Sequence, residues 1–133
     1  MVCVSLHESL DVERNIAIGR ALQPLREEGI LILGSGYTFH NMGAFFNPSD
    51  TTHRAALEFN DWLHKVIIQD HDLSKLKDWE EAPGARMCHP REEHLLPLLV
   101  VAGSTSQSEK AQLIFDTRKE ANDHAVTGYL FSS

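Results

Sequence analysis

The sequence lacks the features that mark membrane, nucleic-acid-binding and disulfide-rich proteins. No apolar run approaches the roughly 20 residues of a membrane-spanning helix, and no basic region followed by an apolar one marks a signal peptide. The net charge is −7 without a Lys/Arg cluster, so we expect neither nucleic acid nor an anionic membrane as a partner. The only two cysteines, Cys3 and Cys88, form no paired motif, which fits a reducing compartment and predicts a cytoplasmic location.

The composition is that of an ordinary globular protein. The 133 residues are 42% apolar and 23% charged, which is enough to bury a core without disulfides. We therefore expect one domain over residues 1–133. The eight histidines are many for this length, and histidine is both the commonest metal ligand and the side chain that exchanges protons near neutral pH. We expect two or three of them to be functional.

The apolar patterns predict an α/β fold. Continuous apolar runs at 2–6 and 30–33 are typical of strands covered on both faces, and helical spacing predicts a helix over 12–28 between them. This order predicts a mixed or parallel sheet with flanking helices. Further elements are predicted as helices at 52–69 and 95–102, a helical turn at 73–77, an irregular segment at 82–90, strands at 112–115 and 127–131, and a loop at 119–124.

The loop after the predicted strand 30–33 is the first candidate site. Ligands of open α/β sheets bind beyond the carboxyl ends of the strands, and this loop carries His40 and Asn41. Its start, Gly34-Ser35-Gly36, permits a sharp turn and close approach of the backbone. Because no Lys-Ser/Thr follows at the spacing of a P-loop, we exclude a nucleoside triphosphate site.

The second candidate is residues 89–99, His-Pro-Arg-Glu-Glu-His-Leu-Leu-Pro-Leu-Leu. Charged residues lead directly into an apolar helix, and a histidine at that border, His94, is half-buried where its basicity can be tuned. A plainer interpretation is that Glu92 and Glu93 favour the positive end of the helix dipole and that His94 joins the first turn. The spacing alone favours this plainer interpretation. There is no HExxH, so the zinc-protease motif is absent.

Three blocks of the sequence, residues 19–29, 34–41 and 89–99, resemble successive blocks of the class III extradiol ring-cleaving dioxygenases of the 4,5-DOPA type. Each block alone is loose, but the three together, in this order and approximate spacing, are specific. Trp62 lies in a segment similar to the family's intervening helix. The resemblance covers nearly all of the chain and implies the C-terminal half of the family's α/β catalytic domain.

The resemblance implies an oxygenase that uses a non-haem Fe(II), or Zn(II) in some relatives, with a catechol and O2 as substrates. It implies that His40 is an acid/base or a neighbour of the metal, that His94 is a metal ligand, and that Glu93 is an alternative oxygen ligand completing a 2-His-1-carboxylate set. A histidine with a near-neutral pKa can take a hydroxyl proton and return one later. Two further metal-binding histidines of the family belong to its N-terminal half and have no counterpart here.

Two neighbouring residues are candidate substrate contacts. Asn41 can hold a substrate hydroxyl, although capping a helix is at least as good an interpretation. Arg91 can pair with a substrate carboxylate, although a salt bridge at the rim is the more common role. We expect His89 to be structural, and the other histidines to lie in solvent: His7, His53, His64, His71 and His124.

Two alternatives to an enzyme follow from the same residues. A non-catalytic remnant would expose a strand edge and apolar surface, which a homodimer or the missing N-terminal half would cover. A histidine-based metal or redox-ligand binder without turnover is the third possibility.

Overall fold

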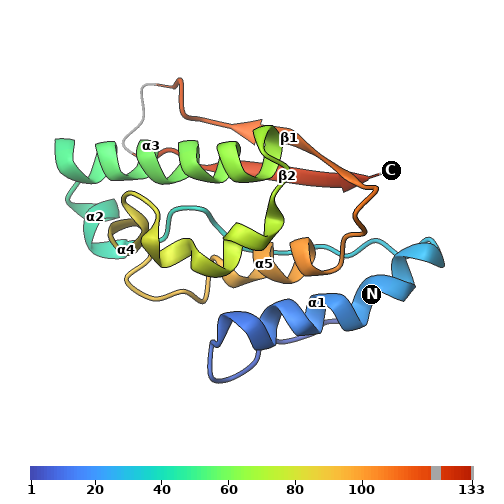
Figure 1. Cartoon of the computed structure of the whole chain (residues 1–133). Helices are drawn as coiled ribbons and strands as arrows, with labels where there is room; N and C mark the ends of the chain where they lie inside the picture. Colours follow the sequence, from blue (N-terminus) through green and yellow to red (C-terminus); the bar gives the residue numbers. More distant parts are fainter. Residues whose placement is uncertain (121–123, 133) are drawn as a thin grey trace.

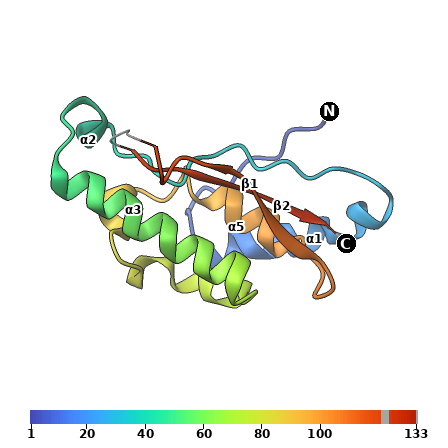
Figure 2. The same ribbon diagram turned by 90° about the horizontal axis from the view of Figure 1, so that it is seen from above.

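The computed structural model describes residues 1–120 and 124–132. Its helices gather on one side of a thin layer of extended chain (Figures 1 and 2). Helix α1 (Val12–Glu27) packs along α5 (Leu96–Gly103), and α3 (Asp50–His64) continues into the π-helical turn η1 (Lys65–Gln69). The remaining helices are short: α2 (Met42–Phe46), the 3-10 helix η2 (Leu73–Glu81) and α4 (Ala85–Cys88).

Local sequence explains where the helices begin. The side chain of Asp11 accepts a hydrogen bond from the Arg14 N–H and caps α1, as a short oxygen-bearing residue does at this position. Ser49 and Thr52 form a capping box at the start of α3. Helix α1 crosses α5 so closely that a Cβ on Gly19 would collide with the Val100 carbonyl oxygen. The two helices therefore depend on a glycine at their crossing.

The two strands form an antiparallel pair. Strand β1 (Lys110–Asp116) pairs with β2 (Thr127–Ser132), with Ala111 opposite Phe131 and an irregularity between Leu113 and Phe115. One side of this pair contacts the helical core, whose largest fully buried side chains include Phe59, Leu63, Ile67, Leu76, Trp79, Leu95, Leu96 and Leu99. For the residues that the structure describes, Figure 2 shows no helix on the other side.

The predicted α/β class is confirmed, but the strands predicted at 2–6 and 30–33 are wrong. Among the described residues, neither segment pairs in a ladder, and the sheet is antiparallel and two-stranded. Val2 is 89% exposed and Leu33 is 80% exposed. Both runs have the composition of strands covered on two faces. Among the described residues no neighbouring strand supplies an edge to either run, so both segments remain unpaired.

The predicted helices are largely confirmed. The helix expected over 12–28 is α1, the one expected over 95–102 is α5, and the one expected over 52–69 is divided into α3 and η1. The predicted turn at 73–77 extends to Glu81, and the irregular segment 82–90 contains α4. The loop expected over 119–124 lies partly outside the described residues. Over the part of the chain that is described, no helix is both long and apolar enough to cross a membrane.

Candidate functional site

The loop from Gly34 to His40 crosses the first turn of α5 at very short range. A Cβ on Gly36 would collide with the His94 carbonyl oxygen, and the next residue, Tyr37, donates its N–H to that same oxygen at 2.8 Å. The His40 N–H then donates to the Cys88 carbonyl oxygen at 2.9 Å. These contacts fix the loop on both sides of the candidate site. The segment Gly34-Ser35-Gly36, which the sequence predicted to permit close approach of the backbone, makes that approach to α5.

The two predicted site histidines, His40 and His94, are brought together by this crossing. Their imidazole rings stack with centroids 3.4 Å apart and an angle of 17° between the planes. The lone pair of an imidazole nitrogen lies in the ring plane, so two nearly parallel rings at this separation do not direct their lone pairs to one point. In this arrangement His40 and His94 are stacked neighbours, and the role of His40 as a metal ligand stays a prediction.

Glu93 lies where it could act as a second metal ligand beside His94. The His94 Nε2 lies 3.6 Å from the Glu93 Oε1, and both side chains are a little over a third exposed. Two donors at roughly 2.0–2.2 Å from one ion lie about 3–4 Å apart. Partial burial and the charge of His40 lower the pKa of His94, while Glu93 raises it. The lowered pKa favours the neutral imidazole, which is the form that binds metals.

The described residues supply only part of a metal shell. Across 1–120 and 124–132, no group of three or more His, Cys, Asp or Glu side chains is placed to hold an ion. The imidazole of His94 and the carboxylate of Glu93 are the donor types of a 2-His-1-carboxylate site. They therefore fit such a site in kind, but further ligands are needed to complete it.

The two predicted substrate contacts, Asn41 and Arg91, are engaged with the protein. The Asn41 side chain caps α2 by accepting from the Ala44 N–H at 3.0 Å, and it donates to the Met87 carbonyl oxygen at 2.7 Å. The Arg91 Nε lies 3.3 Å from the Glu93 Oε2, and its side chain is 68% exposed. Helix capping and a rim salt bridge, the two alternatives from the sequence, both occur.

His89 is the most deeply buried histidine near the site. It is fully buried, and its ring lies edge-to-face with Phe59 and Trp79, at 5.5 and 5.9 Å between centroids. Neither ring nitrogen makes a hydrogen bond of normal geometry to another described residue. Burial lowers the pKa of His89 to about 4; a Thr38 backbone group opposes this, and the charges of His40 and His94 add to it. Burial against two aromatic rings is what the structural role expected from the sequence predicts.

His124 is the neighbouring residue that the sequence did not reveal. Expected in solvent, its half-buried ring stacks on Phe39 at 4.8 Å and on Phe45 at 5.1 Å between centroids. Phe39 immediately precedes His40, so His124 contributes to the packing behind the loop that carries the candidate site. Its polar flanking sequence gave no indication of this, because the contact is made across the fold.

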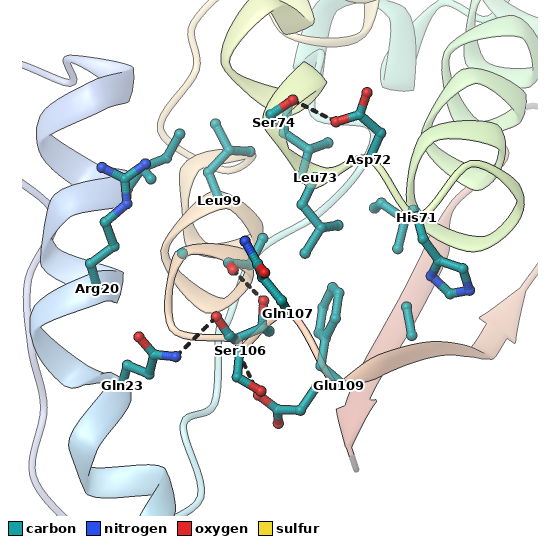
Figure 3. A pocket seen from close by; sticks show the side chains of 18 of the residues that line it. Arg20, Gln23, His71, Asp72, Leu73, Ser74, Leu99, Ser106, Gln107 and Glu109 are labelled. Carbon is teal, nitrogen blue, oxygen red and sulfur yellow. Dashed lines mark hydrogen bonds between the residues drawn. The ribbon is translucent and has the colours of Figure 1, made fainter.

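A hollow of about 1080 Å³ lies elsewhere, between α1, η2 and the segment that joins α5 to β1 (Figure 3). None of the predicted site residues lines it. Part of its polar wall is bonded within the protein: the Gln23 side chain donates to the Thr105 carbonyl oxygen at 3.4 Å, and the Ser106 N–H donates to Glu109 at 2.7 Å. These bonds hold the segment leading into β1 against α1.

Comparisons with known proteins point to one family. Residues 1–128 match the family described as the catalytic LigB subunit of aromatic ring-opening dioxygenase. The chain is 35% identical to the 4,5-DOPA dioxygenase extradiol of Portulaca grandiflora, over 96% of this chain and 46% of the relative. It is 35% identical to that of Mirabilis jalapa, over 84% and 42%, and 33% identical to the dioxygenase tasH of Hapsidospora irregularis, over 87% and 40%. The chain thus spans less than half the length of these relatives.

Proposed function

Because this chain belongs to the family of the catalytic LigB subunit of aromatic ring-opening dioxygenases, we propose that it supplies one half of an extradiol ring-cleaving site. The substrate we propose is a catechol of the DOPA type, together with O2. The observation that carries the proposal is the stacked pair of His40 and His94, with Glu93 beside His94. An acid/base and a metal ligand in contact are what this reaction needs.

The two histidines have different roles in this proposal. His94, with Glu93, holds a non-haem Fe(II), or Zn(II) as in some relatives, and the other ligands come from outside this chain. When bound, such an ion orients and polarises the diol and O2. His40 stacks against His94 instead of sharing its ligand direction. It therefore remains free to take a proton from a catechol hydroxyl and to return one later in the reaction.

The neighbouring polar residues set up this arrangement. Both polar groups of Asn41 are engaged, with Ala44 and Met87, so we propose that it positions the loop carrying His40, and its contact with a substrate hydroxyl stays a prediction. Arg91 is exposed beside Glu93. Of the two residues, Arg91 is the better candidate to bind a substrate carboxylate, because its side chain can turn away from Glu93 into solvent at little cost.

The competing proposal is a non-catalytic module that pairs with a second copy or another partner. The partial donor set favours it, since the described residues hold no complete metal shell and metal affinity falls when ligands are missing. In that case the family site would survive only as a structural remnant, and the exposed apolar segments would be the functional part.

A ring-opening assay separates the two proposals. The chain is incubated with Fe(II), DOPA and air, alone and with the unmatched remainder of the Portulaca relative supplied as a second polypeptide. We expect a yellow ring-opened product in at least one of these mixtures, reduced about 100-fold or more by His40→Ala. The control is His71→Asn, which removes an exposed imidazole at a positive φ of 50° that asparagine tolerates. If neither mixture yields product, the non-catalytic proposal is favoured.

A further inference from the structure

A groove of about 280 Å³ separates the unpaired segment 31–37 from β2. The floor is formed by side chains of α5, chiefly Leu98 and Val101, and His94 lines the groove as well. Extended chain thus runs along both walls, and the candidate metal ligand lies in the same groove.

The wall formed by residues 31–36 has unused backbone groups. Over the described chain, the N–H and C=O groups of these residues make no hydrogen bond, although the flanking N–H groups of Ile30 and Tyr37 are bonded to Leu25 and His94. Most of residues 31–36 are exposed, so these groups are left to solvent. An extended segment with a row of unpaired N–H and C=O groups is a template on which another strand can pair.

The opposite wall is the edge of β2 that faces away from β1. The Thr127 N–H donates to the Thr38 Oγ1 at 2.9 Å, and the Phe131 carbonyl oxygen accepts from Arg26 at 2.9 Å, so both residues direct backbone groups away from β1. Backbone groups of a strand alternate between its two edges. Tyr129, midway between these two residues, therefore also presents its N–H and C=O to the groove.

The outer face around the groove is apolar. Leu31 is 73% exposed, Leu33 is 80% exposed, and Ile114 is 63% exposed, and all three line the groove. Exposed apolar groups beside unpaired strand edges are typical of a surface that a partner covers. More than half of the length of the Portulaca and Mirabilis relatives has no counterpart in this chain.

From these observations we propose that a β-strand from the remaining part of the dioxygenase fold inserts into this groove, pairing with residues 31–36 and with Tyr129 while its apolar side chains cover Leu31 and Leu33. This is strand addition to an open edge, in which main-chain hydrogen bonds provide affinity. The inserted strand lies beside His94, so the same docking brings the partner's groups to the candidate site. In this last respect the inference rests on the proposed function.

Amide hydrogen exchange tests the docking without metal or substrate. The probe is the unmatched remainder of the Portulaca relative, added to the full chain as a separate polypeptide. We expect slower exchange at the amides of residues 31–36 and Tyr129. Leu33→Lys should weaken binding at least about tenfold by placing a charge in the covered apolar face. Ala17→Lys, which adds the same charge at an exposed position of α1 outside the groove, should not.

The possible results decide separate questions. Protection of residues 31–36 and Tyr129 without ring opening would support the docking and contradict the proposed function. Ring opening in the mixture without protection of these amides would leave the function standing and overturn the inference. Protection in the chain alone, with a doubled mass in solution, would assign the groove to a second copy and also overturn it. If the two polypeptides do not bind at all, the docking inference is overturned as well.

Discussion

The Tyr37 N–H donates to the His94 carbonyl oxygen at 2.8 Å, and this bond joins the two sequence blocks that carry the candidate site. Three residues later His40 stacks on the ring of His94. The bond is possible because the preceding Gly36 brings the backbone against α5 without a side chain. The geometry of the histidine pair thus depends on one close backbone crossing, which leads to a first prediction.

Substituting Gly36→Ala should lower the free energy of unfolding by at least about 2 kcal/mol, because the added methyl group would overlap the His94 carbonyl oxygen and force the backbone apart. Gly43→Ala is the matched control, since its Cβ would meet only the Asn41 Oδ1, at 3.4 Å, and alanine favours the helix. Urea denaturation of both variants measures the difference. Equal stability of the two would show that the crossing is not close.

The buried imidazole of His89 leads to a second prediction. Within the described residues the His89 ring nitrogens make no hydrogen bond of normal geometry, although a Thr38 backbone group interacts with the ring. Replacement by an apolar side chain therefore removes a poorly satisfied polar group. His89→Leu should therefore match or exceed the wild-type melting temperature at pH 7, whereas His89→Gln, which keeps polar atoms there, should melt lower. A lower melting temperature for the leucine variant than for the glutamine variant would indicate that the imidazole has a bonding partner in solution.

A third prediction concerns acid stability at the end of β1. Arg118 donates to both carboxylate oxygens of Asp116, at 2.9 and 2.8 Å, and also to Asp61 on α3. These bonds lower the pKa of Asp116 to about 2, with burial opposing them, from 3.8. The unfolded chain therefore binds a proton at higher pH than the folded chain, and folding is stabilised above that range.

The free energy of unfolding should thus decline as pH falls from about 4 towards about 2, with Asp116 contributing part of the slope. In Asp116→Asn this part is missing, so the decline should be shallower. Chemical denaturation at closely spaced pH values measures both slopes. Superimposable slopes would mean that Arg118 does not hold Asp116 in solution.

The sequence predicted the helices better than it predicted the sheet. Helical spacing and caps such as Asp11 act within a few residues, so α1 and α5 were recognised. The three blocks of family resemblance singled out His40 and His94, which the structure brings into contact; their roles stay predictions. Strand formation at 2–6 and 30–33 was predicted from apolar composition, but a strand also needs a neighbouring edge. No part of the described chain supplies that edge to residues 31–36.

Other features of the site are set by contacts between distant segments. His124 lies in a polar stretch, yet its ring stacks on Phe39 and Phe45. Asn41 was equally compatible with a substrate contact and a helix cap, and its bond to the Met87 carbonyl oxygen becomes visible only when α2 and α4 are placed together. Local pattern does not specify such pairings, because they depend on how the elements pack.

The division of roles between His94 and His40 is the central claim, and imidazole nitrogen resonances during Zn(II) titration test it most directly. Zinc is a diamagnetic probe that reports which nitrogen binds even when affinity is low. We predict that a ring nitrogen of His94 shows the shift of metal coordination first, that His40 keeps two uncoordinated nitrogens, and that Glu93→Gln weakens the effect. Coordination at another histidine while the His94 nitrogens remain unchanged, or simultaneous coordination by both His40 and His94, would contradict the account.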